Sequence, residues 1–313
     1  MPLDAASRPR RSTLAVPASN PRFLAKARDL SVDEVFLDLE DAVSPDAKDA
    51  AREAAVAALR AGGWGGKVVA VRVNDATTPW AYRDVITVVE GAGNALDVIM
   101  LPKVTGPDQI AWLDLLLGQL ERATGLPAGR IGIEAQIEDA AGLRDADAIA
   151  AASPRIQALI FGPGDLSASL GTRSLVIGGQ PAGYLGGDAY HYVLMRILVA
   201  ARAAGVQAID GPYAVINDAD GLRAAATSST ALGFDGKWVL HPSQVDIVNE
   251  VFTPSEPEYQ RAVGILDAYE RAASGALLSG GEMIDEATRK MAQSIVAKSR
   301  RPQKGTGDTP VPI

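Results

Sequence analysis

Eight segments with the pattern of β-strands, each followed by a segment with the pattern of an α-helix, run in strict alternation along this 313-residue chain. Strands are predicted at 12–17, 34–41, 68–74, 97–103, 131–137, 158–161, 207–213 and 237–242. Helices are predicted at 20–30, 46–60, 79–90, 107–124, 140–152, 190–204, 219–232 and from 243 onward. Such alternation is typical of a parallel sheet, and eight units match a (β/α)₈ barrel of about 250 residues. We therefore predict an α/β chain with a (β/α)₈ TIM barrel.

An open, doubly wound sheet is the competing fold for the same alternation. That fold normally carries a glycine-rich phosphate loop directly after its first strand. Here the first strand continues into STLAVPASNP, which has no G-x-G-x-x-G pattern. The barrel is therefore preferred.

Two acids end the two strands of the segment 130–167. Glu138 follows the strand 131–137, and Asp165 follows the strand 158–161 through Gly-Pro-Gly. If these parallel strands are neighbours, the two carboxylates converge, and such a pair usually holds a cation or shares a proton. Mg²⁺ suits two carboxylates, since water and substrate oxygens complete its shell. The alternative is that each acid caps the next helix, but the glycine-rich backbone beside Asp165 favours a ligand site.

Polar side chains stand at the tips of most of the other predicted strands as well. The full set is Asp38, Glu40, Asp41, Arg72, Lys103, Glu138, Asp165, Asp210 and His241. Active sites of these barrels lie at the carboxyl ends of the strands, so mixed charges there indicate a polar ligand. For Arg72 two interpretations stay open, an ion pair with Asp38 or Glu40 that supports the barrel mouth, or contact with a substrate.

Composition narrows the class of protein. The formal net charge is -8 and the basic residues form no long stripe, which argues against a nucleic-acid partner. The chain has no cysteine, so disulfides and thiolate metal sites are excluded, and a reducing cytoplasm fits. No stretch approaches a membrane span, and the N-terminus lacks the apolar core of a secretory signal. We expect a cytoplasmic enzyme with no membrane partner.

The segment after the barrel is predicted to form a separate extension. We expect a barrel domain at 1–252, a C-terminal helical lid at 253–299, and a disordered tail at 300–313. The extension reads as two amphipathic helices joined by a glycine-rich turn. Its apolar stripe must pack on the barrel or on a neighbouring subunit. From spacing alone, Asp285 would be the N-cap of the second helix.

Seven fragments, in this order, carry a family resemblance. They are LAVPASNPRFLAKA, VFLDLEDAV, VVAVRVND, IMLPKV, EAQIEDAAGL, LIFGPGDLSASLG and GKWVLHPSQVDIVNEVF. From Arg11 to Lys298 the chain resembles the HpcH/HpaI aldolase and citrate lyase β-subunit family, and within it the L-malyl-CoA/β-methylmalyl-CoA lyases. The resemblance implies a TIM barrel that uses Mg²⁺, with Mn²⁺ as a substitute. It also implies a homotrimer or dimer of trimers, and reversible cleavage of a 3-hydroxyacyl-CoA thioester to acyl-CoA and a 2-oxo acid such as glyoxylate.

The resemblance assigns roles to the reacting residues one by one. The glutamate of Q-I-E is Glu138 and the aspartate of F-G-x-x-D is Asp165, which implies that both bind Mg²⁺ and that Glu138 also belongs to the catalytic set. The arginine of R-V-N is Arg72, which in the family contacts the carbonyl oxygens of the reacting groups. The aspartate of M-I-D is Asp285, which implies a catalytic acid/base on a lid over the adjacent subunit's site.

The resemblance also implies a site for coenzyme A. Gly164, Asp165 and the pair Leu240-His241 match positions that line it, and Lys26 matches a basic residue that meets a CoA phosphate. Two positions depart from the pattern. Ala15 stands where some relatives have an aromatic residue, and Asn20 stands where they have a phosphate-binding arginine, with Arg22 as a substitute for that arginine.

Two other functions of the same fold stay open at this point. One is a citrate lyase β-like subunit that works only beside an acyl-carrier partner, and the other is an aldolase that acts on free hydroxy acids without CoA. The C-terminal extension argues against the first, and Lys26 with the Gly-Pro-Gly-Asp backbone argues against the second. Thioester hydrolysis after condensation, and the choice of acyl-CoA and 2-oxo acid, also stay open.

Overall fold

The computed structural model describes residues 8–271, 276–279 and 282–299. The chain divides into two compact units at the junction of Phe252 and Thr253, and each unit is described by itself. The segment 300–313, where a disordered tail is predicted, lies outside the described residues.

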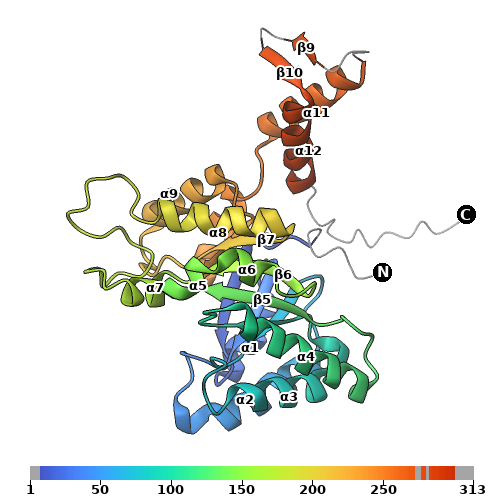
Figure 1. Ribbon diagram of the computed structural model, residues 1–313, viewed down its shortest axis with the longest axis vertical. Coiled ribbons are helices and arrows are strands. Elements are labelled where there is room, and N and C mark those ends of the chain that lie inside the picture. The colour runs from blue at the N-terminus through green and yellow to red at the C-terminus, as the bar shows by residue number, and fades with distance from the viewer. Residues whose placement is uncertain (1–7, 272–275, 280–281, 300–313) are drawn as a thin grey trace, which may run out of the picture. The chain divides into compact units, whose positions relative to one another are not determined.

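The first unit is a closed barrel of eight parallel strands, which confirms the predicted (β/α)₈ fold (Figure 1). The strands are β1 (Ser12–Pro17), β2 (Glu34–Asp38), β3 (Val68–Arg72), β4 (Val98–Leu101), β5 (Gly132–Ile137), β6 (Ile156–Phe161), β7 (Gln207–Asp210) and β8 (Gly236–Val239). They pair in sequence order, and β1 closes the barrel on β8 with Ser12 opposite Lys237. The predicted neighbours β5 and β6 are paired, so the tips that carry Glu138 and Asp165 lie side by side.

Helices follow the strands and cover the outside of the barrel. They are α1 (Pro21–Ala27), α2 (Lys48–Ala61), α3 (Ala81–Ala92), α4 (Pro107–Thr124), α5 (Ala140–Arg144), α6 (Ala146–Ala150), α7 (Pro163–Ser169), α8 (His191–Ala204), α9 (Ala219–Leu232) and α10 (Val245–Val251). The prediction of a single helix at 140–152 is wrong, because the backbone of Asp145 is not helical and separates α5 from α6. The short helix α7, which carries Asp165, was not foreseen.

Strand β2 ends earlier than its apolar pattern suggests, since its terminal acid binds the turn that follows. In β2, the carboxylate of Asp38 accepts hydrogen bonds from the amides of Glu40 at 2.9 Å and Ala42 at 3.2 Å. The chain therefore turns at Asp38, and the two acids predicted to continue the strand lie in the loop after it.

The barrel has an inner and an outer apolar core, because side chains of a strand alternate between its two faces. The inner core fills the barrel itself with side chains such as Phe36, Met100, Ile160 and Trp238. The outer core packs the other face of the strands against the helices. The barrel is thus filled rather than hollow.

A buried polar cluster closes the amino-terminal end of the barrel. The side chain of Arg10 donates to Glu34 and Glu134, at 2.8 Å each, and to Gln207 at 2.7 Å and Gln157 at 2.5 Å. Both glutamate side chains are fully buried. Burial raises the pKa of Glu34 well above its usual value, and the neighbouring Glu134 raises it further.

The second unit consists of α11 (Glu256–Arg271), β9 (Ala276–Ser279), β10 (Glu282–Asp285) and α12 (Glu286–Ser299). The expected turn between the two helices contains an antiparallel pair of strands, in which Met283 lies opposite Leu278. Ala262, Ile284 and Ala292 are buried within this unit.

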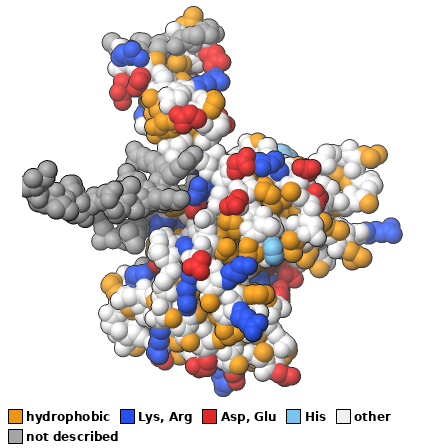
Figure 2. Space-filling model, turned by 180° about the vertical axis from the view of Figure 1, so that it is seen from behind, with side chains coloured by type: hydrophobic (Ala, Val, Ile, Leu, Met, Phe, Trp, Pro, Cys, Tyr) orange, Lys and Arg blue, Asp and Glu red, His pale blue; other side chains and the backbone are white. Residues whose placement is uncertain are grey.

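Surface features are consistent with the composition. Figure 2 shows Lys and Arg side chains interspersed with Asp and Glu on one face of the barrel unit, with no basic stripe there. In the described part of the chain, every helix is too short or too polar to cross a membrane.

Candidate active site

A cavity of about 370 Å³ lies among the carboxyl ends of the barrel strands. Six residues proposed from the sequence line it together, namely Ala15, Arg72, Glu138, Gly164, Asp165 and Leu240. They come from five different places along the chain, and the closed barrel brings them to one mouth. The cavity is therefore our candidate active site.

Arg72 lies at the end of β3 and is held by two acids of the β2 tip. Its Nε and Nη2 donate to the two carboxylate oxygens of Asp38, at 2.8 and 2.7 Å, and its Nη1 lies 3.1 Å from Glu40. The ion pairs of the structural interpretation are thus present, and Arg72 also lines the cavity. A guanidinium has five N–H donors, so donors remain for an oxygen of a bound substrate.

The surroundings of Arg72 fix its charge and its plane. Its guanidinium carbon lies 5.1 Å from the ring centre of Trp238 and 5.6 Å from that of Phe36, within the range of cation–π contacts. Burial disfavours the charged form, but Asp38 and Glu40 outweigh it and raise the pKa of Arg72 above its usual value. Arg72 is thus a fixed, permanently positive donor at the cavity wall.

Glu138 follows β5 and is almost completely buried, at 3% exposure. One of its carboxylate oxygens accepts the main-chain amide of Lys103 at 2.8 Å. Burial raises its pKa to about 7, against the lowering effects of Arg72 and of that amide. A group so poised is costly to ionise unless a cation lies beside it.

Asp165, in the first turn of α7, is more open than Glu138, with a side chain 43% exposed. Gly162 lies just before α7, and a Cβ at that position would stand 2.1 Å from the Glu138 carboxylate. Glycine there gives the Glu138 carboxylate the room it occupies beside α7.

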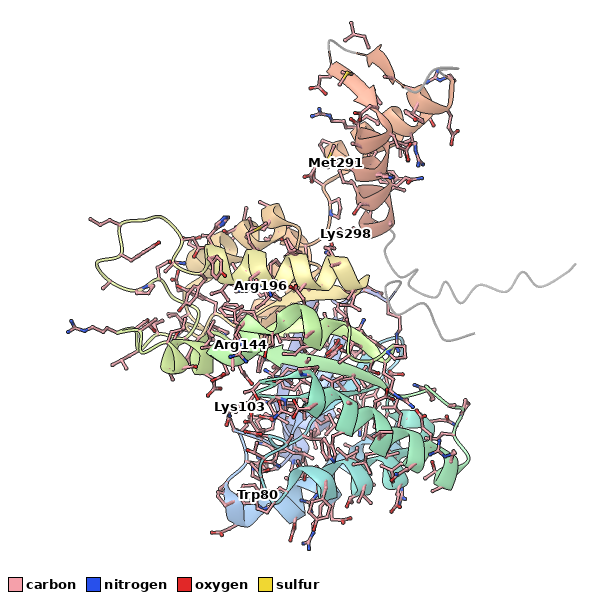
Figure 3. The ribbon with its side chains drawn as sticks, in the orientation of Figure 1. Trp80, Lys103, Arg144, Arg196, Met291 and Lys298 are labelled. Atoms are coloured by element: carbon pink, nitrogen blue, oxygen red, sulfur yellow. The ribbon has the colours of Figure 1, made fainter. Side chains whose placement is uncertain are left out.

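Three further residues of the site are Lys103 and Asp41, which the sequence indicates only as polar strand tips, and Glu40, which it also indicates as a partner of Arg72. The Lys103 ammonium contacts Glu40 directly and lies 3.2 Å from Asp41 and 3.8 Å from Asp165. In Figure 3, Lys103 lies at the end of the barrel toward which the β5 arrow of Figure 1 points. Only the charge at each tip could have indicated them, because the contacts join segments 62 or 63 residues apart.

The donor set fits a hard divalent cation. Around Arg72 and Lys103 lie five carboxylates, those of Asp38, Glu40, Asp41, Glu138 and Asp165, so acids outnumber cations. Among the described residues no group of three or more metal-binding side chains converges. The protein would thus supply Glu138 and Asp165, with water and substrate oxygens as the other ligands, which is the way Mg²⁺ is usually held.

The remaining residues proposed for CoA do not line the cavity; Asn20, Arg22 and Lys26 belong to α1 or its cap, and His241 follows the cavity residue Leu240. Asn20 caps α1, since its side chain accepts from the amides of Arg22 at 3.2 Å and Phe23 at 3.3 Å. Arg22 and Lys26 are exposed on α1. His241 is also exposed and accepts from the amide of Ser243. The Asn20 oxygen is therefore engaged by its own helix, which leaves the exposed cations of α1 as the groups available to a phosphate.

Asp285 belongs to the second unit, at the end of β10. Its carboxylate accepts from the amide of Thr288 at 2.9 Å and from the Thr288 hydroxyl at 3.0 Å, so it caps α12. These two hydrogen bonds hold the pKa of Asp285 below its usual value. The described geometry of Asp285 is that of a helix cap.

Comparison with known proteins shows which enzymes the chain is similar to. It is 40% identical, over 94% of its length and 95% of the relative's, to an L-malyl-CoA/β-methylmalyl-CoA lyase of Cereibacter sphaeroides. It is 36% identical, over 86% of its length and 81% of the relative's, to a malyl-CoA/β-methylmalyl-CoA/citramalyl-CoA lyase of Chloroflexus aurantiacus. A crystal structure of CitE from Mycobacterium tuberculosis with magnesium, acetoacetate and coenzyme A superposes with a TM-score of 0.74 at 30% identity, over 94% of this chain and 99% of that one.

The model of the HpcH/HpaI aldolase/citrate lyase family matches residues 11–242, which span all eight barrel strands and every residue that lines the cavity. With the closed barrel, the acid-rich mouth and these relatives in agreement, the chain belongs to the HpcH/HpaI aldolase/citrate lyase family.

Proposed function

We propose that the protein is a Mg²⁺-dependent lyase that reversibly cleaves a 3-hydroxyacyl-CoA thioester to an acyl-CoA and a 2-oxo acid. L-malyl-CoA, which gives acetyl-CoA and glyoxylate, is the first candidate substrate, and β-methylmalyl-CoA and citramalyl-CoA are of the same class. The main supporting observation is a cavity at the strand ends that is lined by the buried guanidinium of Arg72 and by the carboxylates of Glu138 and Asp165. The lyases that the chain resembles support this reading.

Cleavage of the bond between C2 and C3 develops negative charge at two places, on the hydroxyl oxygen and on the thioester half, and both charges must be stabilised. The C3 hydroxyl of a malyl thioester gives up its proton to solvent, its oxygen becomes the aldehyde oxygen of glyoxylate, and the bond between C2 and C3 breaks to leave an enolate on the acetyl-CoA half. Held by Glu138 and Asp165, Mg²⁺ would act as a Lewis acid on the hydroxy-acid oxygens. Arg72, fixed by Asp38 and the Trp238 ring, would donate to the thioester oxygen as negative charge develops there.

The enolate carbon must also take up a proton, which requires an acid on the far side of the bond. We propose Asp285 for this role, contributed by the C-terminal unit of a neighbouring subunit in a cytoplasmic homotrimer or dimer of trimers. The support is the M-I-D resemblance and the location of Asp285 outside the barrel unit. Light scattering coupled to size-exclusion chromatography would measure the number of subunits.

For the thioester we propose a path along α1 and the β8 tip. The exposed cations Arg22 and Lys26 would meet the CoA phosphates, with Asn20 and His241 beside them. The cavity residues Ala15, Gly164 and Leu240 would line the way to the reacting end.

One assay separates this function from the two alternatives. The purified protein alone, with L-malyl-CoA and Mg²⁺, should release acetyl-CoA and glyoxylate. Activity that appears only after an acyl-carrier protein is added would support a citrate lyase β-like subunit. Cleavage of free hydroxy acids with no use of the thioester would support a CoA-independent aldolase. A panel of acyl-CoAs and 2-oxo acids would then identify the preferred pair and any hydrolysis of the thioester.

A further inference from the structure

Lys103 has an unusual backbone for its residue type. It follows β4 with a φ of 50°, and it is the one non-glycine among the described residues with a positive φ. This left-handed conformation is sterically unfavourable for an L-residue. The turn is therefore held in place by what Lys103 contacts.

The main chain of Lys103 contacts one of the two proposed metal ligands. In the left-handed turn its amide donates to a Glu138 oxygen at 2.8 Å, and the next amide, of Val104, donates to the carbonyl of Gln136 at 3.3 Å. The turn after β4 is thereby fastened to the end of β5. The conformation of Lys103 thus sets the orientation of the Glu138 carboxylate.

The side chain of Lys103 contacts the other proposed ligand. Its ammonium lies 3.8 Å from an oxygen of Asp165, while it also contacts Glu40 and lies 3.2 Å from Asp41. Glu40 and Asp41 belong to the loop after β2, so the ammonium contacts that loop as well as Asp165 of α7. It occupies the region in which a cation shared with Asp165 would also lie.

We propose that Lys103 is a positioning residue that regulates the occupancy of the metal site. Its amide aligns Glu138, and its ammonium serves as the counter-ion of Asp165 until a divalent cation arrives. The ammonium then stays with Glu40 and Asp41 and yields Asp165 to the metal. This inference rests on the proposed function, because it takes Glu138 and Asp165 as the ligands of Mg²⁺.

The two roles of Lys103 predict opposite changes in Mg²⁺ affinity when the ammonium is removed. If the ammonium competes with the metal for Asp165, its removal should strengthen metal binding, since the site then carries one positive charge fewer. If Lys103 only braces the loops, its removal should loosen the ligands and weaken binding, or change nothing.

Isothermal titration of the full-length protein with Mg²⁺, and with Mn²⁺ as a second probe, in the absence of any thioester, measures this directly. Lys103→Gly and Lys103→Asn both lack the ammonium and both tolerate a positive φ. Each should bind Mg²⁺ at least about fivefold more tightly than the wild type. Lys103→Arg keeps the charge and should stay within about twofold of the wild type.

A fourth variant tests the amide. Lys103→Ala also lacks the ammonium but disfavours the left-handed turn. It should bind Mg²⁺ more weakly than Lys103→Gly, because the amide no longer holds Glu138 in line. Circular dichroism melting of all four variants verifies that each is folded. If Lys103→Gly is not folded, Lys103→Asn takes its place in the comparison.

Three results would overturn the inference. Weaker or unchanged Mg²⁺ binding in the folded Gly and Asn variants would make Lys103 a brace alone. Equal tightening in Lys103→Arg would remove charge as the cause. A wild-type protein that binds neither Mg²⁺ nor Mn²⁺ would overturn both this inference and the proposed metal site, whereas normal wild-type binding with the first or second result leaves the proposed function intact.

Discussion

Asp38 and Arg72 are register partners at the ends of β2 and β3, and their side chains are also joined by two parallel hydrogen bonds. Neighbouring strands therefore determine the plane of the guanidinium before any substrate binds. Such preorganisation is the property required of a group that stabilises charge in a transition state.

Replacing Arg72 by lysine tests this arrangement. Lysine keeps the charge but loses the planar fork that engages both oxygens of Asp38. We expect turnover of L-malyl-CoA to fall by at least about 10²-fold, measured at saturating Mg²⁺. Arg223, which pairs with Glu250 in the same two-bond manner on the surface, gives the matched control Arg223→Lys, whose rate should be unchanged. A near-normal rate for Arg72→Lys would leave Arg72 with only its structural ion pairs.

Metal removal tests the roles of Glu138 and Asp165. Chelation by EDTA should abolish lyase activity, and added Mg²⁺ should restore it, because the ion proposed at these two carboxylates supplies the Lewis acid. Glu138→Gln and Asp165→Asn should each require far more Mg²⁺ for half-maximal activity, while the melting temperature stays near that of the wild type. Glu250→Gln, on the surface, is the control for loss of a carboxylate. Full activity after rigorous chelation would exclude this assignment.

The buried pair Glu34 and Glu134 predicts how stability depends on pH. Because burial and the neighbouring carboxylate raise the pKa of Glu34, the folded protein holds a proton that the unfolded chain releases. Its contribution to stability is full below the usual glutamate pKa and is lost as pH rises through the raised value. Glu34→Gln keeps a neutral group of the same size beside Arg10. Compared with the wild type, this variant should become relatively more stable as pH rises above about 4.5.

Urea denaturation of the two proteins at a series of pH values between 4.5 and 8 gives the difference in unfolding free energy. Parallel curves for the wild type and Glu34→Gln would mean that Glu34 ionises alike in the folded and unfolded states. That outcome would contradict the raised pKa.

Mixing two variants that are each inactive at the Mg²⁺ concentration of the wild-type assay tests the proposed sharing of sites between subunits. Asp285→Asn retains a good helix cap, so α12 should persist. This variant should bind metal and acetyl-CoA but fail to exchange the methyl protons of acetyl-CoA with solvent. Combined with Glu138→Gln subunits, it should regain activity, since some sites then receive an intact barrel from one chain and an intact Asp285 from its neighbour. If subunits are seen to exchange and the mixture remains inactive, Asp285 acts within its own chain or only caps its helix.

The barrel and the juxtaposition of the β5 and β6 tips could be predicted from sequence, because both follow from local periodicity and from the order of parallel strands. The Arg10 cluster could not, since its hydrogen bonds join residues between 24 and 197 positions apart. The backbone of Lys103 could not either, because a positive φ at lysine has no signature in composition. The antiparallel pair β9 and β10 was hidden by the glycines around it, which are typical of turns.

The polar cluster around Arg10 and the packed interior of the barrel also affect the order in which ligands bind and leave at the carboxyl ends of the strands. Because the barrel interior is filled, the candidate site is closed on that side. Substrates and products therefore enter and leave through the opening at the carboxyl ends of the strands. In the proposed reaction, a 2-oxo acid bound at Glu138 would lie deeper than the CoA thioester that follows it through the same opening. We therefore expect an ordered release of products, in which the acyl-CoA leaves before the 2-oxo acid.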